Sequence, residues 1–276
     1  MSEFDSIGHL IKKILDSQNA EPNVISYKEH QQGKVDWYNN MVGSLNEADG
    51  YNCDACKNRG FIAMLGENDN EVIVRCKCQK VRATLRMAQQ SGLGDIITEY
   101  TFDKYIPTDE WQKVIKDKAQ AFCQDEEAHW FYIGGQVGSG KTHICTAIAA
   151  YYIKLGREVK YMLWSEDAKK LKAMVNDTGY QDDIAIYKKI DVLYIDDFLK
   201  VKSGEKPTPA DINLAFEIIN HRIFDKDKIT IISSEKTLDD MLEYDEATMS
   251  RIYQRAGMYK INIGKDKSKN YRLREV

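Results

Sequence analysis

The sequence has no long apolar run and no marked excess of charge of one sign. No stretch approaches the roughly 18 consecutive apolar residues of a membrane span, and the N-terminal MSEFDSIGHLIKKIL is acidic and amphipathic, unlike a secretory signal. The absence of a membrane span and of a secretory signal predicts a cytoplasmic protein with no membrane partner. Because 39 Lys and Arg stand against 43 Asp and Glu, for a net charge of -4, any contact with nucleic acid has to be local.

Signatures of several other enzyme classes are also missing. The sequence holds no H-E-x-x-H motif of zinc proteases, nothing that supports a Ser/His/Asp triad, and no internal repeat. What is present is the composition of a globular protein, since 43% of the 276 residues are hydrophobic and 30% are charged. This length allows one large or two smaller domains with a sizeable core.

Residues 1–50 are predicted to be a helical N-terminal segment. Pro22 and the polar residues after it end a first amphipathic helix, and a second helical stretch is expected over 37–45. The first helix is predicted from apolar residues at helical spacing, namely Phe4, Ile7, Leu10, Ile11, Ile14 and Leu15.

The sign of the local charge reverses after this segment. Residues 51–90 are net basic and contain four of the six cysteines, so they are predicted to form a small separate module. Residues 91–128 are predicted to be a linker, because glycines and Pro107 interrupt the pattern before a helix over 111–123.

From residue 129 onward, apolar runs alternate with helical patterns. This regular alternation of strands and helices predicts an α/β domain over 129–276, with a parallel sheet sandwiched by helices. Thr208 and Pro209 are expected to be the N-cap and first turn of a helix over 210–223. The predicted strands are 129–135, 158–164, 191–197, 228–234 and 258–264.

A glycine-rich loop fitting G-x-x-x-x-G-K-[ST] follows the first of these strands and opens a helix. Glycines let the backbone curl so that its N–H groups point at phosphates, and the helix N-terminus adds partial positive charge. We expect Lys141 to contact the β- and γ-phosphates and Thr142 to ligate Mg²⁺. The alternative is a chance glycine turn before a helix. The predicted loop comprises Gly135, Gln136, Val137, Gly138, Ser139, Gly140, Lys141 and Thr142.

An acidic pair ends the third predicted strand. Asp196 and Asp197 follow the apolar run 192–195 and should emerge at the same edge of the sheet as the phosphate loop. Asp196 is predicted to contact Mg²⁺ through water, and Asp197 to polarise an attacking water. Such a pair alone is usually a solvated strand end, but combined with the phosphate loop it predicts an NTPase.

Four cysteines fall at the spacing of metal ligands. Cys53 and Cys56 are separated by two residues, and Cys76 and Cys78 by one, which supplies the four thiolates of a closed tetrahedral zinc site. A hairpin is expected between the pairs, around 66–70, in a module with too few apolar residues to fold without metal. The alternative is four unrelated buried thiols. The two other cysteines, Cys123 and Cys145, are expected in the core.

With these motifs the sequence resembles the AAA+ ATPases of the DnaC/DnaI type, the bacterial and phage helicase loaders. The resemblance covers most of the chain and implies ATP as the nucleotide. It also implies a polar sensor 1 at the end of the fourth strand, where Ser233-Ser234-Glu235 stands. Because Glu235 replaces the more usual Asn, and an anion beside the γ-phosphate is unfavourable, Ser234 is the alternative carrier of this role.

The resemblance also implies an arginine that reaches the nucleotide of a neighbouring subunit. Arg251 and Arg255 lie four residues apart, on one face of a predicted helix, and either fits this role. The alternative is a solvated basic face. The residues after 264 are too few for a helical lid, so we expect no substantial lid, and the sensor arginine of the lid is either missing or replaced by a residue such as Arg272. Arg222 is a further position that resembles the family.

From this resemblance we expect an ATP-dependent loader whose N-terminal region binds a DnaB-type replicative helicase and whose ATPase domain self-associates with ATP and binds single-stranded DNA. The rival enzyme is a transposase helper ATPase of the IstB type, against which the four-cysteine module argues. A third hypothesis is a non-hydrolysing, ATP-switched module that binds the helicase. Lysines between the second and third strands are candidates for DNA contacts, or else part of a mixed solvated surface: Lys169, Lys170, Lys172, Lys188 and Lys189.

Overall fold

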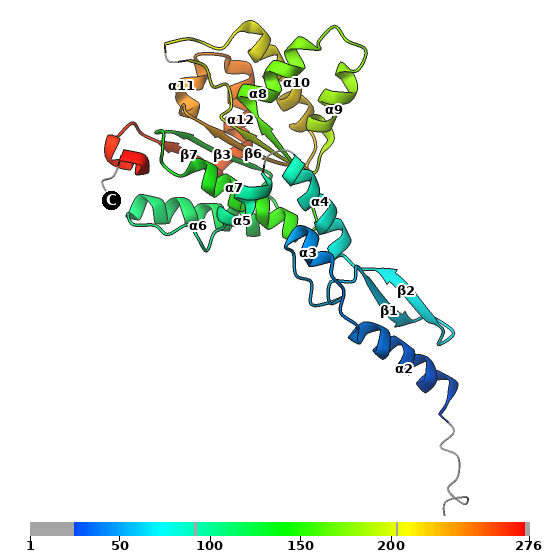
Figure 1. Ribbon diagram of the computed structural model, residues 1–276. Coiled ribbons are helices and arrows are strands. Elements are labelled where there is room, and N and C mark those ends of the chain that lie inside the picture. The colour runs from blue at the N-terminus through cyan, green and yellow to red at the C-terminus, as the bar shows by residue number, and fades with distance from the viewer. Residues whose placement is uncertain (1–24, 91–92, 203, 274–276) are drawn as a thin grey trace, which may run out of the picture. The chain divides into compact units, whose positions relative to one another are not determined.

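The computed structural model describes residues 25–90, 93–202 and 204–273 (Figure 1). The amphipathic helix predicted over residues 4–15 lies outside the described residues. The chain divides into two compact units, of which the first ends at Cys76 and the second begins at Lys77. No helix within the described ranges is both long enough and apolar enough to cross a membrane.

The first unit begins its described part with helix α2, Tyr27–Asn40. Ser26 caps this helix, because its Oγ accepts a hydrogen bond from the Glu29 backbone and the Glu29 side chain bonds back to the Ser26 backbone N–H. The helix predicted over 37–45 therefore starts ten residues earlier and ends at Asn40. A short helix α3, Leu45–Asp49, follows it.

An antiparallel hairpin completes the first unit. Strands β1, Phe61–Leu65, and β2, Glu71–Arg75, flank the turn that was predicted over 66–70. The Asn39 side chain on α2 accepts from the Ala63 backbone N–H and donates to its carbonyl, both at 2.9 Å, which joins helix and hairpin. Among the described residues, the buried apolar side chains of this unit are few: Val35, Cys56, Ala63 and Cys76.

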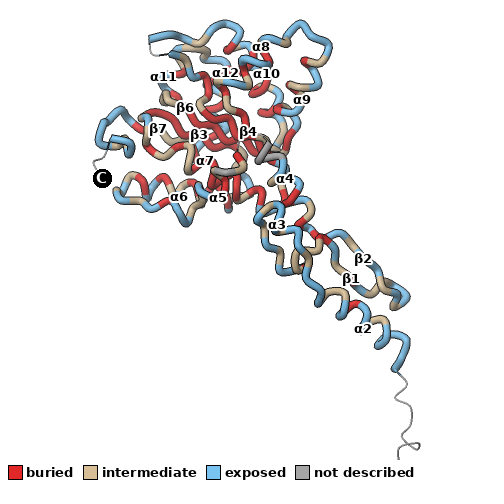
Figure 2. The backbone as a smooth tube through the Cα atoms, viewed as in Figure 1, coloured by how far each residue is buried: buried red, intermediate tan, exposed pale blue. Residues whose placement is uncertain are grey.

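The second unit contains a five-stranded, wholly parallel sheet in the order β4-β5-β6-β3-β7. All five strands fall within a residue or two of their predicted positions, and the central ones do so because each is a buried apolar run of the length that a doubly covered strand requires. The three central strands are buried along their whole length (Figure 2). The strands are β3 (Trp130–Gly135), β4 (Val159–Leu163), β5 (Val192–Asp196), β6 (Ile229–Ser234) and β7 (Lys260–Ile263).

Helices cover both faces of this sheet, as predicted (Figure 1). One face carries α4 (Cys78–Gln90), α5 (Gly94–Glu99), α6 (Glu110–Gln124) and α7 (Lys141–Lys154). The other carries α8 (Trp164–Ala173), α9 (Tyr180–Lys189), α10 (Pro209–Arg222), α11 (Leu238–Leu242) and α12 (Glu246–Ala256). Short 3₁₀ turns at Gly257–Tyr259, Lys267–Lys269 and Tyr271–Leu273 complete the described part.

The N-terminus of helix α10 is predictable from the sequence, whereas the contacts at its C-terminus are visible only in the structure. Thr208 caps it and Pro209 occupies its first turn, which confirms the prediction. At its last residue, Arg222 is fully buried and donates to backbone carbonyls of α9, of its C-cap Ile190 and of β6, and to the Thr230 hydroxyl. Arg222 therefore fastens α10 to the sheet, and burial lowers its pKa to about 10.

The region expected to be a linker, 91–128, contains helices α5 and α6. Both contact α7, the helix that follows the phosphate loop. They belong to the same compact unit as the sheet, which begins already at Lys77.

Candidate functional site

The phosphate loop connects β3 to α7 and depends on glycines at two tight positions. Gly138 has φ +73°, and a Cβ there would lie 1.9 Å from the side-chain oxygen of Asn270. Gly140 has φ +86°, and a Cβ there would lie 3.1 Å from the ring of Tyr105. Since L side chains rarely adopt such φ values, the sequence folds into this loop only because glycine stands at both positions.

Lys141 is the first residue of α7, and its side chain is buried beneath the loop. Its Nζ donates to the carbonyl oxygens of Gly135 at 2.9 Å and Gln136 at 2.7 Å. Burial lowers the pKa of Lys141, while the nearby carboxylates, Glu235 first among them, oppose that shift. The ammonium group is thus held at the mouth of the loop, where a bound polyphosphate would replace the carbonyls as its partner.

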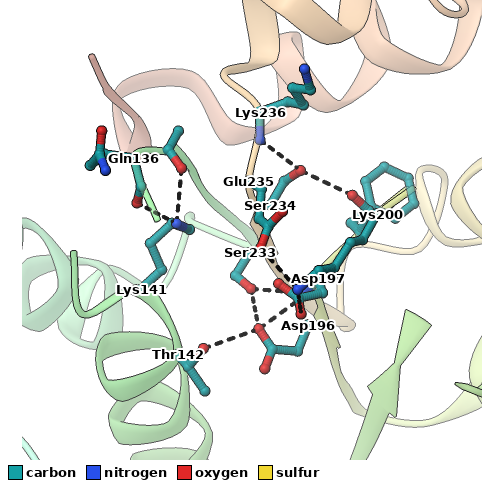
Figure 3. A network of polar contacts seen from close by, with 12 residues as sticks. Gln136, Lys141, Thr142, Asp196, Asp197, Lys200, Ser233, Ser234, Glu235 and Lys236 are labelled. Carbon is teal, nitrogen blue, oxygen red and sulfur yellow. Dashed lines mark hydrogen bonds and ion pairs between the residues drawn. The ribbon is translucent and has the colours of Figure 1, made fainter. Parts of the chain in front are cut away.

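Asp196, the last residue of β5, is buried and accepts hydrogen bonds from three hydroxyl groups, of which Figure 3 shows those of Ser233 and Thr142. Ser233 Oγ donates to its Oδ1, Tyr161 Oη donates to its Oδ2 at 3.1 Å, and Thr142 Oγ1 lies 3.5 Å from its Oδ1. The structure thus brings together Thr142 and Asp196, the two predicted magnesium ligands. A hydroxyl and a carboxylate at this separation are oxygen donors of the kind that Mg²⁺ prefers.

Asp197 follows at the start of the next loop, with φ +54°. Its Oδ2 forms an ion pair with Lys200 at 2.9 Å, and the same ammonium group lies 2.9 Å from Oε1 of Glu235 (Figure 3). Sequence reasoning singled out both carboxylates and missed Lys200. No motif marks that lysine, because the fold of the loop brings it between them.

The two serines at the end of β6 point in different directions. Ser233 donates to Asp196, whereas the Ser234 hydroxyl donates to the carbonyl of Phe198 at 3.0 Å. Side chains alternate across a strand, so only one of two neighbouring serines can face the carboxylate. Sequence reasoning named Ser234 and passed over Ser233, because the register of β6 against β3 and β5, which decides between them, is not written in the sequence. The sensor role stays a prediction.

A pocket of about 530 Å³ opens beside the phosphate loop, a size suited to a small-molecule ligand. The second half of the loop forms one wall, together with Asp197, Lys200 and Glu235. The segment between α5 and α6 forms another, together with one residue of α6, and its two tyrosines offer rings that a planar base can stack against. The residues of this second wall are Tyr100, Lys104, Tyr105, Ile106, Thr108 and Gln112.

His143 on α7 holds that second wall against the loop. Its ring stacks on Tyr100, with centroids 4.8 Å apart, and meets Tyr105 edge-on at 5.1 Å. Its Nε2 lies 2.9 Å from the carbonyl oxygen of Thr101. Burial raises the pKa of Tyr105 to about 12, so this phenol stays neutral. Sequence reasoning missed these residues, because a scattered Tyr and His carry no motif.

The residues after β7 lie directly on the phosphate loop. The backbone N–H of Tyr271 donates to the carbonyl of Gly138 at 2.9 Å, and the N–H of Asp266 donates to Oε1 of Gln136 at 2.9 Å. Tyr271 and Arg272 both line the pocket. Arg272 therefore lies beside the pocket, and its role as a replacement for the lid arginine stays a prediction.

The two candidate finger arginines lie on α12 and are not among the described residues that line the pocket. Arg251 donates to the carbonyl of Ala247, and Arg255 donates to the carbonyl of Ile223. Arg255 is exposed and Arg251 partly so. Their position keeps them away from the pocket of their own chain.

The candidate DNA-contacting lysines divide into two groups. Lys172 pairs with Asp211, and Lys188 lies 2.6 Å from Glu217, so both are engaged with α10. Lys169, Lys170 and Lys189 are exposed on α8 and α9. The mixed charged surface that the sequence offered as the alternative describes this region better than a continuous basic track.

The four predicted metal-ligating cysteines come together. The Sγ atoms of Cys53, Cys56, Cys76 and Cys78 all lie within 4.8 Å of one another. Zn–S bonds of about 2.3 Å give a tetrahedron with edges of about 3.8 Å, and the Sγ atoms of Cys53 and Cys76 are 3.7 Å apart. This donor set and its spacing fit zinc.

The turn after the first cysteine pair is shaped to hold the thiols. Lys57 and Asn58 have φ of +47° and +65°, which folds the chain back on itself. The Gly60 backbone N–H lies 3.3 Å from the Sγ of Cys56, and the Asn58 side chain accepts from the Cys53 backbone N–H at 2.8 Å. Cys123 and Cys145 are buried elsewhere, and burial raises the pKa of both thiols, as expected of core residues.

Comparison with known proteins gives relatives along most of the chain. The protein XkdC of the phage-like element PBSX of Bacillus subtilis (strain 168) is 30% identical over 244 residues, which are 83% of this chain and 89% of XkdC. The protein YqaM of the same organism is 31% identical over 211 residues, which are 72% of this chain but only 66% of YqaM. The chain thus spans nearly the whole of XkdC and about two thirds of YqaM.

Among solved structures, the DnaC helicase loader has the same fold as the second unit, with a TM-score of 0.53 and 21% identity over 62% of this chain and 98% of that chain. This confirms the P-loop AAA+ fold that the motifs indicated. The family of IstB-like ATP-binding proteins matches residues 53–275, from the first cysteine of the cluster to the residues beyond the last strand. This match, together with the phosphate loop and the paired carboxylates, shows that the chain belongs to the family of IstB-like ATP-binding proteins, AAA+ proteins with the fold of DnaC.

Proposed function

We propose that this protein hydrolyses ATP and uses it to load a DnaB-type replicative helicase onto single-stranded DNA. The observation that carries the proposal is a pocket lined by the phosphate loop and by Asp197, on a fold shared with nearly the whole of the DnaC helicase loader. The likeness to XkdC, a protein of a phage-like element, fits this reading and its rivals equally.

We assign the steps of this hydrolysis to residues at the phosphate loop and at the ends of the neighbouring strands. Lys141 and the loop N–H groups bind the β- and γ-phosphates, and Thr142 and Asp196 hold Mg²⁺, which when bound neutralises charge on the phosphate oxygens. Asp197 orients the attacking water, for which a carboxylate within hydrogen-bond reach is needed. Tyr100 and Tyr105 take the base on the second wall.

We further propose that the cysteine cluster is a structural zinc site. The described part of the first unit buries very few apolar side chains, and two of those are cysteines of the cluster. A unit with so small a core needs a crosslink or a metal ion to stay folded.

The zinc proposal predicts about one zinc ion per purified chain. Substituting Cys53→Ser and Cys76→Ser together should remove that zinc, because two of four ligands cannot close a tetrahedral site. Elemental analysis measures this, and limited proteolysis should show cleavage within residues 51–76 while the second unit, which includes α4, stays intact. Cys123→Ser is the matched control and should keep its zinc. Full zinc in the double variant would contradict the assignment.

The helicase partner is tested by capture from the lysate of the source organism. With the full chain as bait and a non-hydrolysable ATP analogue present, mass spectrometry should identify the replicative helicase, and the Lys141→Ala chain should show whether capture needs bound nucleotide. The family match supports one rival, a transposase helper ATPase, and its match begins at Cys53, so the cysteine module does not separate the two hypotheses. Capture of a transposase instead of the helicase would favour that rival.

The DNA part of the proposal rests on the likeness to the helicase loaders, and its candidate contacts are Lys169, Lys170 and Lys189, which are exposed on neighbouring helices within a mixed charged surface. A non-hydrolysing ATP-switched module remains the third hypothesis, and Glu235 beside the phosphate loop is the residue that favours it. Turnover of ATP by the purified protein in the presence of single-stranded DNA separates this hypothesis from the first.

A further inference from the structure

One cation lies between two carboxylates at the mouth of the ATP pocket. Lys200 Nζ is 2.9 Å from Asp197 Oδ2 and 2.9 Å from Glu235 Oε1, and all three residues line the pocket (Figure 3). Asp197 follows β5 and Glu235 follows β6, which are neighbours in the sheet. Lys200 therefore bridges the ends of two adjacent strands.

The loop that presents Lys200 is firmly held. The backbone N–H of Lys200 donates to the carbonyl of Asp197 at 3.0 Å, which closes a turn. Phe198 and Leu199, inside that turn, are buried in the core, and the Phe198 backbone bonds to Ser233 and Ser234 of β6. Core packing thus fixes the backbone from which the Lys200 side chain extends, and the two ion pairs fix its ammonium group.

Glu235 faces the phosphate loop, where a negative charge is unfavourable. Among charged neighbours, Glu235 has the largest influence on the pKa of Lys141, followed by Asp197. Burial opposes the charge on Lys200, yet its hydrogen bonds to Glu235 and Asp197 raise its pKa, so it is cationic at neutral pH. Lys200 is the group that offsets the charge of Glu235.

We propose that Lys200 is a positioning residue of the ATP site: it holds the Glu235 carboxylate away from the γ-phosphate and fixes the Asp197 carboxylate where it orients water. The role toward Asp197 rests on the proposed function, because it concerns hydrolysis. The role toward Glu235 concerns only nucleotide binding, and holds whether or not the protein hydrolyses ATP.

The test compares a non-hydrolysable ATP analogue with ADP, since only the former has a γ-phosphate. In Lys200→Ala the dissociation constant of the analogue should rise about tenfold or more, because an unpaired carboxylate then faces that phosphate, while that of ADP stays within about twofold. Glu235→Gln in the Lys200→Ala background should restore the binding of the analogue. Lys202→Ala, an exposed lysine of the same loop, is the matched control and should change neither constant.

These variants should fold, because ion pairs whose side chains are about one-third exposed contribute little to stability. Lys200→Gln, which keeps the length of the side chain, is a second variant with the same expected result. Equal weakening of ADP and the analogue, or no rescue by Glu235→Gln, would overturn the proposal.

Turnover gives a second measurement. With saturating ATP, Lys200→Ala should lower kcat by tenfold or more, and the double variant should recover only part of that loss, because Asp197 still lacks its partner. A rise in turnover would instead make Lys200 an inhibitory contact and overturn the proposal. If the unaltered chain does not hydrolyse ATP, the proposed hydrolysis fails, but the binding ratio still decides the role of Lys200.

Discussion

Lys141→Ala is expected to reduce ATP turnover by roughly a thousandfold or more. The buried ammonium group is the cation nearest the loop carbonyls, so its loss removes the main positive charge that the β- and γ-phosphates meet. Binding of ATP should weaken as well. A steady-state phosphate-release assay with single-stranded DNA measures the turnover, and equilibrium titration with a fluorescent nucleotide measures the binding.

Asp197→Asn should separate these two effects. The amide keeps the shape of the side chain but removes the charge that orients the water, so ATP should bind with little change in affinity and stay uncleaved. Lys154→Ala, at the exposed far end of α7, is the matched control and should keep both activities. If nucleotide affinity fell equally in Lys141→Ala and Asp197→Asn, the separate roles assigned to these residues would be wrong.

Removal of the finger arginine is expected to cost about 10³-fold or more in turnover while leaving ATP binding by the monomer intact. Arg251 and Arg255 lie on α12, outside the described lining of their own pocket, so a finger on this helix must act on a neighbouring chain. A guanidinium then stabilises charge on the transferred phosphoryl group across the contact between chains. ATP should therefore promote self-association, measured by light scattering or sedimentation.

A mixing experiment tests the trans arrangement directly. Chains with Lys141→Ala are inactive but keep both arginines, whereas chains with Arg251→Ala and Arg255→Ala keep their phosphate loop. Mixed in equal amounts, the two should recover activity that neither has alone. A protein that stays monomeric with a non-hydrolysable analogue and DNA, and whose activity per chain does not depend on concentration, would contradict the trans model and favour a solvated helix face.

The strands and the phosphate loop could be predicted because their signals are local. A doubly covered parallel strand is a continuous apolar run, and the loop needs glycine where φ is positive and lysine at the helix start. The N-terminal half was harder. The apolar periodicity of helix α2 is too weak to locate it. The capping box formed by Ser26 and Glu29, which sets its N-terminus, stands in the sequence but was not singled out.

The cysteine cluster was also predictable, since two closely spaced cysteine pairs on either side of a hairpin are typical of a metal site. The serine pair at the end of β6 was not resolved by sequence. Which of Ser233 and Ser234 meets Asp196 depends on the register of β6 against β5, and a shift of one residue would exchange them.

The sequence by itself determined that this chain binds nucleotide on a parallel α/β sheet, because those features follow from short-range chemistry: loop glycines, a helix-initial lysine and strand-end carboxylates. Only the tertiary structure decided which further groups share the pocket. Tyr105, Lys200 and Arg272 line it from three segments that are distant in the sequence. Arg222, which resembled a functional position, is instead a buried structural residue that joins α10 to the sheet. Proximity across a fold is set by how helices pack on a sheet, and no local pattern of residues records it.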